Sequence, residues 1–350
     1  MNIDDYNFDV PEELIAINPS YPRDRSSLVE VKDNFLIHKF NNILNILNKG
    51  DCLILNDTKV IPGQLKGKMN GKNVSITLNK LIKTEENLVI WNVFGKPYKS
   101  FKSGEKIYFS QDFFCKIIRK NKMSNYGGLL IEFNMKLKNF FLKLTEYGQL
   151  AIPPYITKKR DLNDKDIFNY QSIFAKNSGA IAAPTASLHF TSELLRKIRK
   201  KGINIVYITL HVNGGTFIPI RTNNIEDHQM HSEEGEISKI ACKIINEVKI
   251  KNKRCVAVGT TVLRLLESSK DYMGNVLPFK GETEIFIKPG WKITTVDGLI
   301  TNFHTPKSSL FVLVSSILGE KNAKKLYEFA IKKKLRFFSY GDACLIWIKK

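Results

Sequence analysis

One stretch of the chain decides the fold: Cys255-Val256-Ala257-Val258-Gly259-Thr260-Thr261, four mostly apolar residues followed by a glycine and two hydroxyl side chains. Its apolar start predicts a buried strand, which runs through the glycine into a helix from about residue 262 to residue 270. The residues before it show the same alternation, with apolar side chains at helical spacing over 191–201 and 238–252 and an apolar strand over 203–210. Alternating helices and strands predict an α/β domain with a largely parallel sheet.

A different pattern fills residues 61–150. Short apolar runs such as 74–78 and 88–93 are separated there by turns of Gly, Asn and Lys. Several short strands at this spacing are typical of a small β-barrel or a sandwich. Because 350 residues correspond to about two domains, we predict an α/β main domain made of residues 1–60 and 151–350, with an inserted β-rich domain, a barrel or a sandwich, of residues 61–150.

The chain is strongly basic. It carries 54 Lys and Arg against 34 Asp and Glu, a formal net charge of +20. A basic surface of this size favours a polyanionic partner, of which nucleic acid is the usual one. Two interpretations stay open at this point, because abundant Lys, Asn and Ile are also the mark of an AT-rich genome, which would spread Lys evenly along the chain.

Sequence signals for a membrane or for export are absent. The first residues, Met1-Asn2-Ile3-Asp4-Asp5, are acidic and lack an apolar region, and no apolar run approaches 18 residues. We therefore expect a cytoplasmic protein without a membrane partner. The five cysteines stand singly, without the spacing of a zinc or iron–sulfur site, and are expected to be reduced core thiols.

Polar and glycine residues gather where the expected strands end, the edge at which open α/β sheets bind ligands. The segment Gly259-Thr260-Thr261 either holds an anion or a ribose at the start of its helix, or only caps that helix. Residues 211–217 contain the run Asn213-Gly214-Gly215-Thr216, which either lets a ligand approach the backbone closely or forms a plain turn. Further segments of this kind are 56–58, 182–190, 226–233, 302–304 and 340–342.

Five of the six histidines lie in these segments. A single His on a strand, such as His211, is more often a core residue than a functional one. His228 and His231 have the spacing of metal ligands, yet no third ligand stands at a familiar distance, so we predict no metal. Imidazoles near carboxylates are suited to proton transfer. The sequence also lacks a P-loop, a dinucleotide fingerprint and a nucleophile elbow, which argues against those classes of enzyme.

Four of these segments resemble one family, the S-adenosylmethionine:tRNA ribosyltransferase-isomerases, bacterial enzymes that make epoxyqueuosine in tRNA. The resemblance extends from residues 5–16 to residues 336–343 and so covers nearly the whole chain. Its α/β domain with an inserted β-barrel agrees with the division given above. The most specific segments are 179–190 (GAIAAPTASLHF), 210–217 (LHVNGGTF), 225–233 (IEDHQMHSE) and 301–310 (TNFHTPKSSL).

The resemblance implies an unusual reaction. The ribosyl part of S-adenosylmethionine, used as a co-substrate, moves to 7-aminomethyl-7-deazaguanine at the wobble position of tRNA and becomes an epoxy-cyclopentane, while adenine and methionine leave. Because the sulfonium makes the neighbouring 5′-carbon acidic, one or two bases, an acid, an adenine pocket and a ribose clamp suffice, without a metal. We expect a monomer with this tRNA and S-adenosylmethionine as its partners.

The groups that this reaction requires can be assigned to particular residues of the chain. We expect proton transfer by three histidines, with two carboxylates that orient them: His304, His211 and His228, with Asp342 and Glu226. We expect the sulfonium nucleoside to lie in a cradle formed by Gly214, Gly215, Thr216, Thr260 and Thr261, with Pro184, Thr185, His189 and Asn302 as further binding residues.

Some positions depart from the family pattern. Ser187 and Asn213 stand where Gly is usual, and an added side chain there would narrow a loop if the backbone φ is positive. Lys59 and Gln64 stand where Arg is common, and Thr305 replaces an apolar residue; Lys loses the bidentate geometry of Arg. These departures motivate one rival interpretation, a catalytically inactive tRNA-binding protein on the same scaffold. A second rival is a nucleoside-transferring enzyme that acts on a free base, against which the net charge argues.

Overall fold

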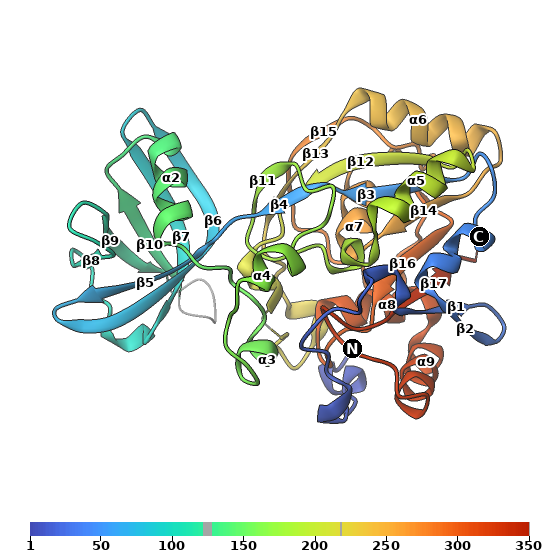
Figure 1. The fold of residues 1–350 in the computed structure, drawn as a ribbon, viewed down its shortest axis with the longest axis horizontal. Helices are drawn as coiled ribbons and strands as arrows, with labels where there is room; N and C mark the ends of the chain where they lie inside the picture. The colour runs from blue at the N-terminus through green and yellow to red at the C-terminus, as the bar shows by residue number, and fades with distance from the viewer. Residues whose placement is uncertain (122–127, 218, 350) are drawn as a thin grey trace.

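The computed structural model describes residues 1–121, 128–217 and 219–349, and it has two parts that lie side by side (Figure 1). A large sheet with helices on both faces forms one part, and a closed barrel of six strands forms the other. The predicted fold class, an α/β main domain with an inserted β-barrel domain, is confirmed. The domain boundaries at residues 61 and 150 stay a prediction. A fragment of residues 61–150 that folds on its own would support them.

The large sheet has nine strands, of which four adjacent ones are parallel: β12 (Asn204–Leu210), β3 (Cys52–Asn56), β14 (Cys255–Val258) and β16 (Gly298–Asn302). Every residue of β3, β14 and β16 is buried, because helices cover both faces of this part of the sheet. Since the four strands are parallel, their carboxyl ends meet along one edge.

The prediction of a largely parallel sheet is wrong for the outer strands. At one side β13 (Glu233–Ile237) and β15 (Phe279–Thr283) are antiparallel to their neighbours. At the other side β17 (Ala343–Trp347) is antiparallel to β16, β1 (Ser27–Val31) is parallel to β17, and β2 (Phe35–Lys39) is antiparallel to β1. Antiparallel neighbours need no crossover helix, and within the described chain no α-helix separates β12 from β13 or β1 from β2.

Alternate side chains of the central strands point into two separate cores. Cys52 and Ile54 of β3 pack with helices on one face, and Leu53 and Leu55 pack with helices on the other. The first face is covered by α6 (Lys239–Ile250), α7 (Thr260–Ser268), α8 (Ser309–Leu318) and α9 (Glu320–Lys332). The second face is covered by α1 (Ile43–Ile46), the 3-10 helix η6 (Thr185–His189) and α5 (Ser192–Lys200).

The first turns of these helices are capped in different ways. Helices α5 and α6 are capped by hydroxyl side chains, because Thr191 accepts a hydrogen bond from the Leu194 N–H and Ser238 accepts one from the Ala241 N–H, both at 3.1 Å. Helix α7 differs, since its N-cap is Gly259 with φ of 99° and no side chain caps it. Neither Thr260 nor Thr261 is the N-cap, so the plain capping role considered for them is wrong. The positive φ explains why a glycine stands there.

The barrel contains six antiparallel strands closed in the order β10-β7-β6-β5-β8-β9. The chain can form it because apolar side chains alternate toward an interior that includes Trp91 and Phe133. Helix α2 (Leu137–Tyr147) packs Phe140 and Leu144 into the same core. The strands are β5 (Gln64–Met69), β6 (Lys72–Glu85), β7 (Leu88–Lys96), β8 (Lys106–Tyr108), β9 (Phe114–Asn121) and β10 (Gly128–Phe133).

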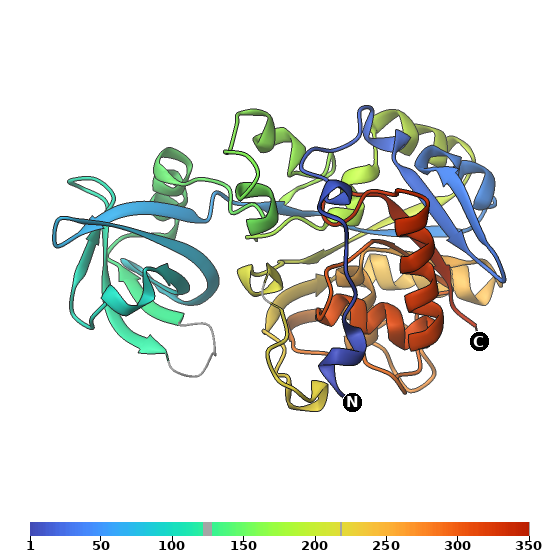
Figure 2. The same cartoon turned by 90° about the horizontal axis from the view of Figure 1, so that it is seen from below.

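Short elements join the two parts. Strand β4 (Thr58–Val60) pairs in parallel with β11 (Asn177–Ala180), and the small helices α3 (Pro154–Thr157) and α4 (Lys165–Asn169) follow the barrel in the chain. The N-terminal segment lies against α8 and α9, where Ile3 and Tyr6 enter the core (Figure 2). Among the described residues, no helix combines the length and the apolar character that a bilayer crossing requires.

Candidate active site

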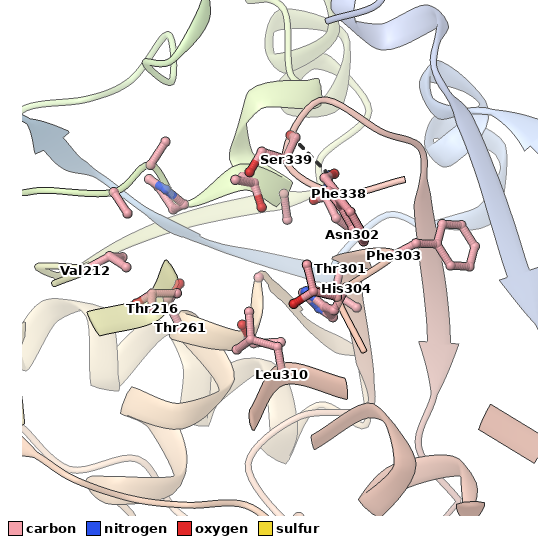
Figure 3. A pocket seen from close by; sticks show the side chains of 18 of the residues that line it. Val212, Thr216, Thr261, Thr301, Asn302, Phe303, His304, Leu310, Phe338 and Ser339 are labelled. Atoms are coloured by element: carbon pink, nitrogen blue, oxygen red, sulfur yellow. Dashed lines mark hydrogen bonds between the residues drawn. The ribbon is translucent and has the colours of Figure 1, made fainter. Parts of the chain in front are cut away.

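A cavity lies at the edge where the parallel strands end. Its solvent-accessible volume is about 130 Å³. The segments that follow β12, β14 and β16 line it, together with residues 182–186 and 338–339. Figure 3 shows Thr216 and Thr261 on one side of the cavity and Asn302, Phe338 and Ser339 on another. The structure thus brings together segments that are far apart in the sequence.

His304 is the predicted proton-transfer residue that lines this cavity. It lies two residues beyond the end of β16, and its Nε2 lies 2.7 Å from Oγ1 of Thr301, the strand's penultimate residue. Its backbone N–H donates to the hydroxyl of Tyr327 at 2.9 Å. Burial lowers the pKa of His304 to about 3, because a charged imidazole would lose its hydration. The ring is therefore neutral near pH 7.

The start of α7 opens into the cavity. Gly259, Thr260 and Thr261 all line it, and no side chain caps the first N–H groups of the helix. Uncapped N–H groups and the helix dipole make such a helix start attractive to negative charge and to ligand oxygens. Because the Gly259 φ is positive, the chain turns sharply there and leaves the helix start uncovered.

A buried ion pair, which the sequence analysis did not predict, forms one wall. Arg264 of α7 donates from Nη1 to Oε2 of Glu233 on β13, and the two side chains are 6% and 3% exposed. Oε1 of Glu233 accepts hydrogen bonds from the Asn213 N–H at 3.2 Å and from Thr216 Oγ1 at 3.5 Å. The remaining guanidinium nitrogen, Nη2 of Arg264, is buried without a hydrogen-bond partner in the described structure. Both residues line the cavity.

A second wall comes from three residues that the analysis also missed. The Tyr155 hydroxyl donates to Ser339 Oγ at 2.5 Å and accepts from the Ser339 N–H at 3.0 Å. Phe338 has a φ of 70°, a strained value for a residue with a side chain. Asn302 Nδ2 donates to the Phe338 carbonyl at 3.0 Å and so helps to hold this conformation. Strained backbone of this kind clusters at functional sites.

Comparison with known proteins gives the family. The family described as queuosine biosynthesis protein matches residues 3–346. The chain belongs to this family. The S-adenosylmethionine:tRNA ribosyltransferase-isomerase of Zymomonas mobilis is 42% identical over 347 residues, 99% of each chain. Its counterpart in Halothermothrix orenii is 42% identical over 355 residues, 99% of this chain and 100% of its own.

A solved structure agrees with these relatives. The crystal structure of an S-adenosylmethionine tRNA ribosyltransferase from Thermotoga maritima aligns with 98% of this chain and 99% of its own, at 28% identity and a TM-score of 0.54. The prediction that the chain is an enzyme of the queuosine biosynthesis family is confirmed.

Seven of the predicted site residues line the cavity: Pro184, Thr185, Thr216, Thr260, Thr261, Asn302 and His304. His211 lines a different, polar cavity with Asp57, and its Nδ1 lies 2.8 Å from Thr58 Oγ1. Burial lowers the pKa of His211, against a smaller effect of Glu234. This position does not favour the catalytic role predicted for His211, which stays a prediction.

The segment 225–233 reaches the cavity only in part: Glu233 lines it, but the two predicted catalytic residues of the segment do not. His228 packs edge-on against Phe286 with ring centroids 5.5 Å apart, and burial lowers its pKa, with a smaller contribution from His231. Glu226 is exposed and pairs with Lys288. Neither residue lines the cavity. Within the described residues, no cluster of three His, Cys, Asp or Glu side chains is arranged to hold a metal ion.

Two further predicted residues are buried beside the cavity. Nδ1 of His189 lies 2.7 Å from Ser26 Oγ, and its ring stacks on Phe40; burial lowers its pKa to about 3, partly opposed by the neighbouring Asn302 side chain. Asp342 accepts hydrogen bonds from the Ser27 N–H at 2.7 Å and the Arg336 N–H at 2.8 Å. These two contacts hold separate backbone segments together. Burial raises the pKa of Asp342, because a charged carboxylate loses its hydration there.

The Gly214-Gly215 pair does not line the cavity. A Cβ on Gly215 would lie 2.3 Å from Cδ2 of His231, and one on Gly214 would lie 3.3 Å from the carbonyl oxygen of Leu78 in β6. Gly214 therefore allows β6 of the barrel to lie close, Gly215 leaves room for the His231 ring, and the nucleoside-binding role of the pair stays a prediction. Ser187 and Asn213 are not among the residues with positive φ. Their side chains thus cause no backbone strain where relatives have glycine.

Proposed function

We propose that the chain transfers and isomerises the ribosyl group of S-adenosylmethionine onto 7-aminomethyl-7-deazaguanine at the wobble position of tRNA. The products are epoxyqueuosine in tRNA, adenine and methionine. One observation carries the proposal. The family segments, separated by up to about a third of the chain, meet at a single cavity where a neutral imidazole, His304, stands among hydroxyl groups.

His304 has the properties that a base needs in this reaction. A sulfonium makes the hydrogens of the adjacent ribose carbon acidic, so a neutral acceptor can remove one of them. If Nε2–H of His304 donates to Thr301 Oγ1, the other ring nitrogen, Nδ1, is free to accept the proton. Among the described residues, none hydrogen-bonds to Nδ1. Burial keeps the imidazole neutral near pH 7, so Nδ1 holds a lone pair when the substrate binds, although the low pKa makes the ring a weaker base than a free imidazole.

The remaining lining fits S-adenosylmethionine. Nη2 of Arg264 is a buried donor without a partner, and we assign it to the methionine carboxylate. Thr260 and Thr261 at the uncapped start of α7 supply N–H and hydroxyl groups for the ribose oxygens. Glu233 compensates the guanidinium charge in the absence of ligand. The protein is proposed to act as a monomer and without a metal.

The decisive test offers the enzyme both substrates together. Incubation with S-adenosylmethionine and tRNA that carries the aminomethyl base should release adenine and increase the mass of the wobble nucleoside in equal amounts. The matched control is the same tRNA with guanine at the wobble position, which lacks the attacking amine. Tight tRNA binding without adenine release would favour the inactive tRNA-binding protein, and turnover of the free base alone would favour the nucleoside-transferring enzyme.

A further inference from the structure

Positive charge is concentrated in the barrel region. Residues 61–150 contain 16 Lys and Arg against 6 Asp and Glu, a net charge of +10, which is half of the +20 of the whole chain. These residues make up about a quarter of the chain. A genome-wide preference for Lys would spread the charge in proportion to length, so this concentration requires another explanation.

The strand register sets three of these cations in rows on the outer face of the barrel. Lys96 of β7, Ser75 of β6 and Lys66 of β5 are directly opposite one another across three strands. In the next row, Asn73 of β6 is opposite Lys68 of β5. Residues opposite one another point to the same face of a sheet, so Lys66, Lys68 and Lys96 share one exposed surface.

Aromatic rings continue the second row. Lys68 is opposite Tyr108 of β8, and Tyr108 is opposite Phe114 of β9. The Tyr108 ring is 46% exposed and lies 5.4 Å from the Phe114 ring, over which Lys106 Nζ lies at 4.8 Å. Together the two rows border an open groove, called here the barrel groove, lined by Lys66, Gly67, Lys68, Asn73, Val74, Ser75, Lys96, Pro97, Tyr108, Phe109 and Ser110.

The lysines of the barrel groove differ from several other lysines of the barrel region in their surroundings. Other barrel lysines have acidic partners, such as Lys80 with Glu282 and Lys143 with Asp112. In the described part of the protein, no carboxylate lies within ion-pair distance of Lys66, Lys68 or Lys96. Uncompensated cations beside an exposed ring match the two needs of a nucleic-acid strand, phosphate neutralisation and base stacking.

We propose that the barrel groove binds the tRNA, with Lys66, Lys68 and Lys96 on phosphates and Tyr108 stacked on a base. This inference rests on the proposed function, because tRNA is the polyanion that the enzyme must hold. Strand faces of small barrels bind nucleic acid in this way. The barrel would then hold the RNA while the cavity in the α/β part receives the reacting base, which must leave its stack to enter.

The test compares two triple charge reversals in full-length protein. Lys66→Glu/Lys68→Glu/Lys96→Glu changes the groove. Lys200→Glu/Lys251→Glu/Lys321→Glu changes three exposed lysines that are not in ion pairs. Lys200 and Lys251 lie at the ends of α5 and α6, next to the strand ends opposite the cavity. Affinity for unmodified tRNA is measured between 50 and 300 mM salt.

We expect the groove variant to bind tRNA at least about tenfold more weakly and to lose roughly 2 to 3 from the slope of log affinity against log salt. The control variant should retain the wild-type slope. Tyr108→Ala should weaken binding roughly tenfold and Tyr108→Phe should not, because stacking needs the ring alone. Affinity for S-adenosylmethionine should be unchanged in all of them, which shows that each variant is folded.

Failure of this inference and failure of the proposed function give different results. If both triple variants bind tRNA like the wild type, or lose affinity equally, the groove is not the tRNA site, whatever the enzyme does. If the groove variant alone loses affinity but the wild type releases no adenine with modified tRNA, the groove inference stands and the proposed reaction is wrong.

Discussion

Thr301 Oγ1 and His304 Nε2 are 2.7 Å apart, and this contact fixes the orientation of the imidazole at the cavity. Thr301 belongs to β16, all of whose residues are buried, so the hydroxyl that holds the ring is itself held by the sheet. The Tyr327 hydroxyl holds the His304 backbone from α9. An imidazole that is fixed from two elements loses little freedom when substrate binds, which would favour the proton transfer proposed for it.

Replacement of this histidine should abolish most of the activity. His304→Asn removes the proton acceptor but keeps a polar side chain near Thr301, and we expect the rate of adenine release to fall by roughly 10²- to 10⁴-fold. The rate is measured at saturating S-adenosylmethionine and modified tRNA. His38→Asn is the matched control, because His38 lies on the edge strand β2, away from the cavity. Equal rates for His304→Asn and the control would remove His304 from the mechanism.

Thr301→Val tests the positioning role separately. Without the hydroxyl the ring loses its fixed orientation, so kcat should fall while binding of S-adenosylmethionine changes little. A Thr301→Ser variant retains the hydroxyl and should restore most of kcat. If Val and Ser variants behave alike, the contact between Thr301 and His304 is structural only.

The buried imidazoles should make the free energy of unfolding depend on pH. The pKa of His189 is lowered to about 3 by burial, while an unfolded chain has the ordinary value of about 6.5. Between these values the unfolded state binds more protons, so stability is complete above about pH 6.5 and is lost as the pH falls toward 3. His304 contributes in the same direction.

His189→Gln should therefore flatten this dependence. The variant has no imidazole to protonate at that position, so its free energy of unfolding should decline less than that of the wild type between pH 7.5 and 5. Urea denaturation at both pH values gives the two slopes. Parallel declines in variant and wild type would show that His189 is not buried in its neutral form.

The strand ends and the barrel could be predicted because they depend on local pattern. Apolar runs followed by Gly259 or by Asn302 mark the ends of buried strands, and parallel strands bring such ends together. The outer strands could not be predicted, because the choice of parallel or antiparallel neighbour depends on pairing between distant segments such as β1 and β17. The sequence also does not show which of His304 and His211 lines the cavity. Both follow apolar strands, but in the structure they line different cavities.

Arg264 was missed for a related reason. An Arg inside a helix is usually an exposed residue, and only the fold shows that this one is 5% exposed. One signal was present, because Arg264 is three and four residues beyond Thr261 and Thr260, on the same face of α7. Its position on the helix face that carries two predicted ligand-binding hydroxyls therefore indicates that Arg264 points toward the cavity.

Gly259 is expected to be required for its backbone conformation rather than for space. A Cβ at Gly259 would be in ordinary contact, 3.4 Å from Thr261 Oγ1, but its φ of 99° is unfavourable for any side chain. Gly259→Ala should cost about 1–3 kcal/mol of stability and weaken S-adenosylmethionine binding, because relaxation of the strain moves the start of α7. Gly104→Ala is the control, since Gly104 has φ of 86° and open space but lies in the barrel. Both variants should lose stability in urea denaturation, and only Gly259→Ala should lose affinity.

The buried pair of Glu233 and Arg264 allows stability and ligand binding to be tested separately. Arg264→Met leaves the Glu233 carboxylate buried without its partner, which should cost about 3–5 kcal/mol. Glu233→Gln leaves the guanidinium unpaired in the same way. The double variant Glu233→Gln/Arg264→Met removes both charges, and the Gln carbonyl oxygen can still accept from the Asn213 N–H. Its free energy of unfolding should therefore be closer to the wild-type value than the sum of the single effects implies.

Binding measurements on the double variant then test the role assigned to Arg264 Nη2. If this nitrogen donates to the methionine carboxylate, the double variant should bind S-adenosylmethionine at least about tenfold more weakly even though its fold is retained. Decarboxylated S-adenosylmethionine provides the complementary change, because it lacks the group that Arg264 is proposed to hold. Loss of the carboxylate should weaken binding to the wild type and have little effect on the double variant. If its loss weakens binding equally in both proteins, Arg264 supports the cavity wall through Glu233 and does not contact the carboxylate.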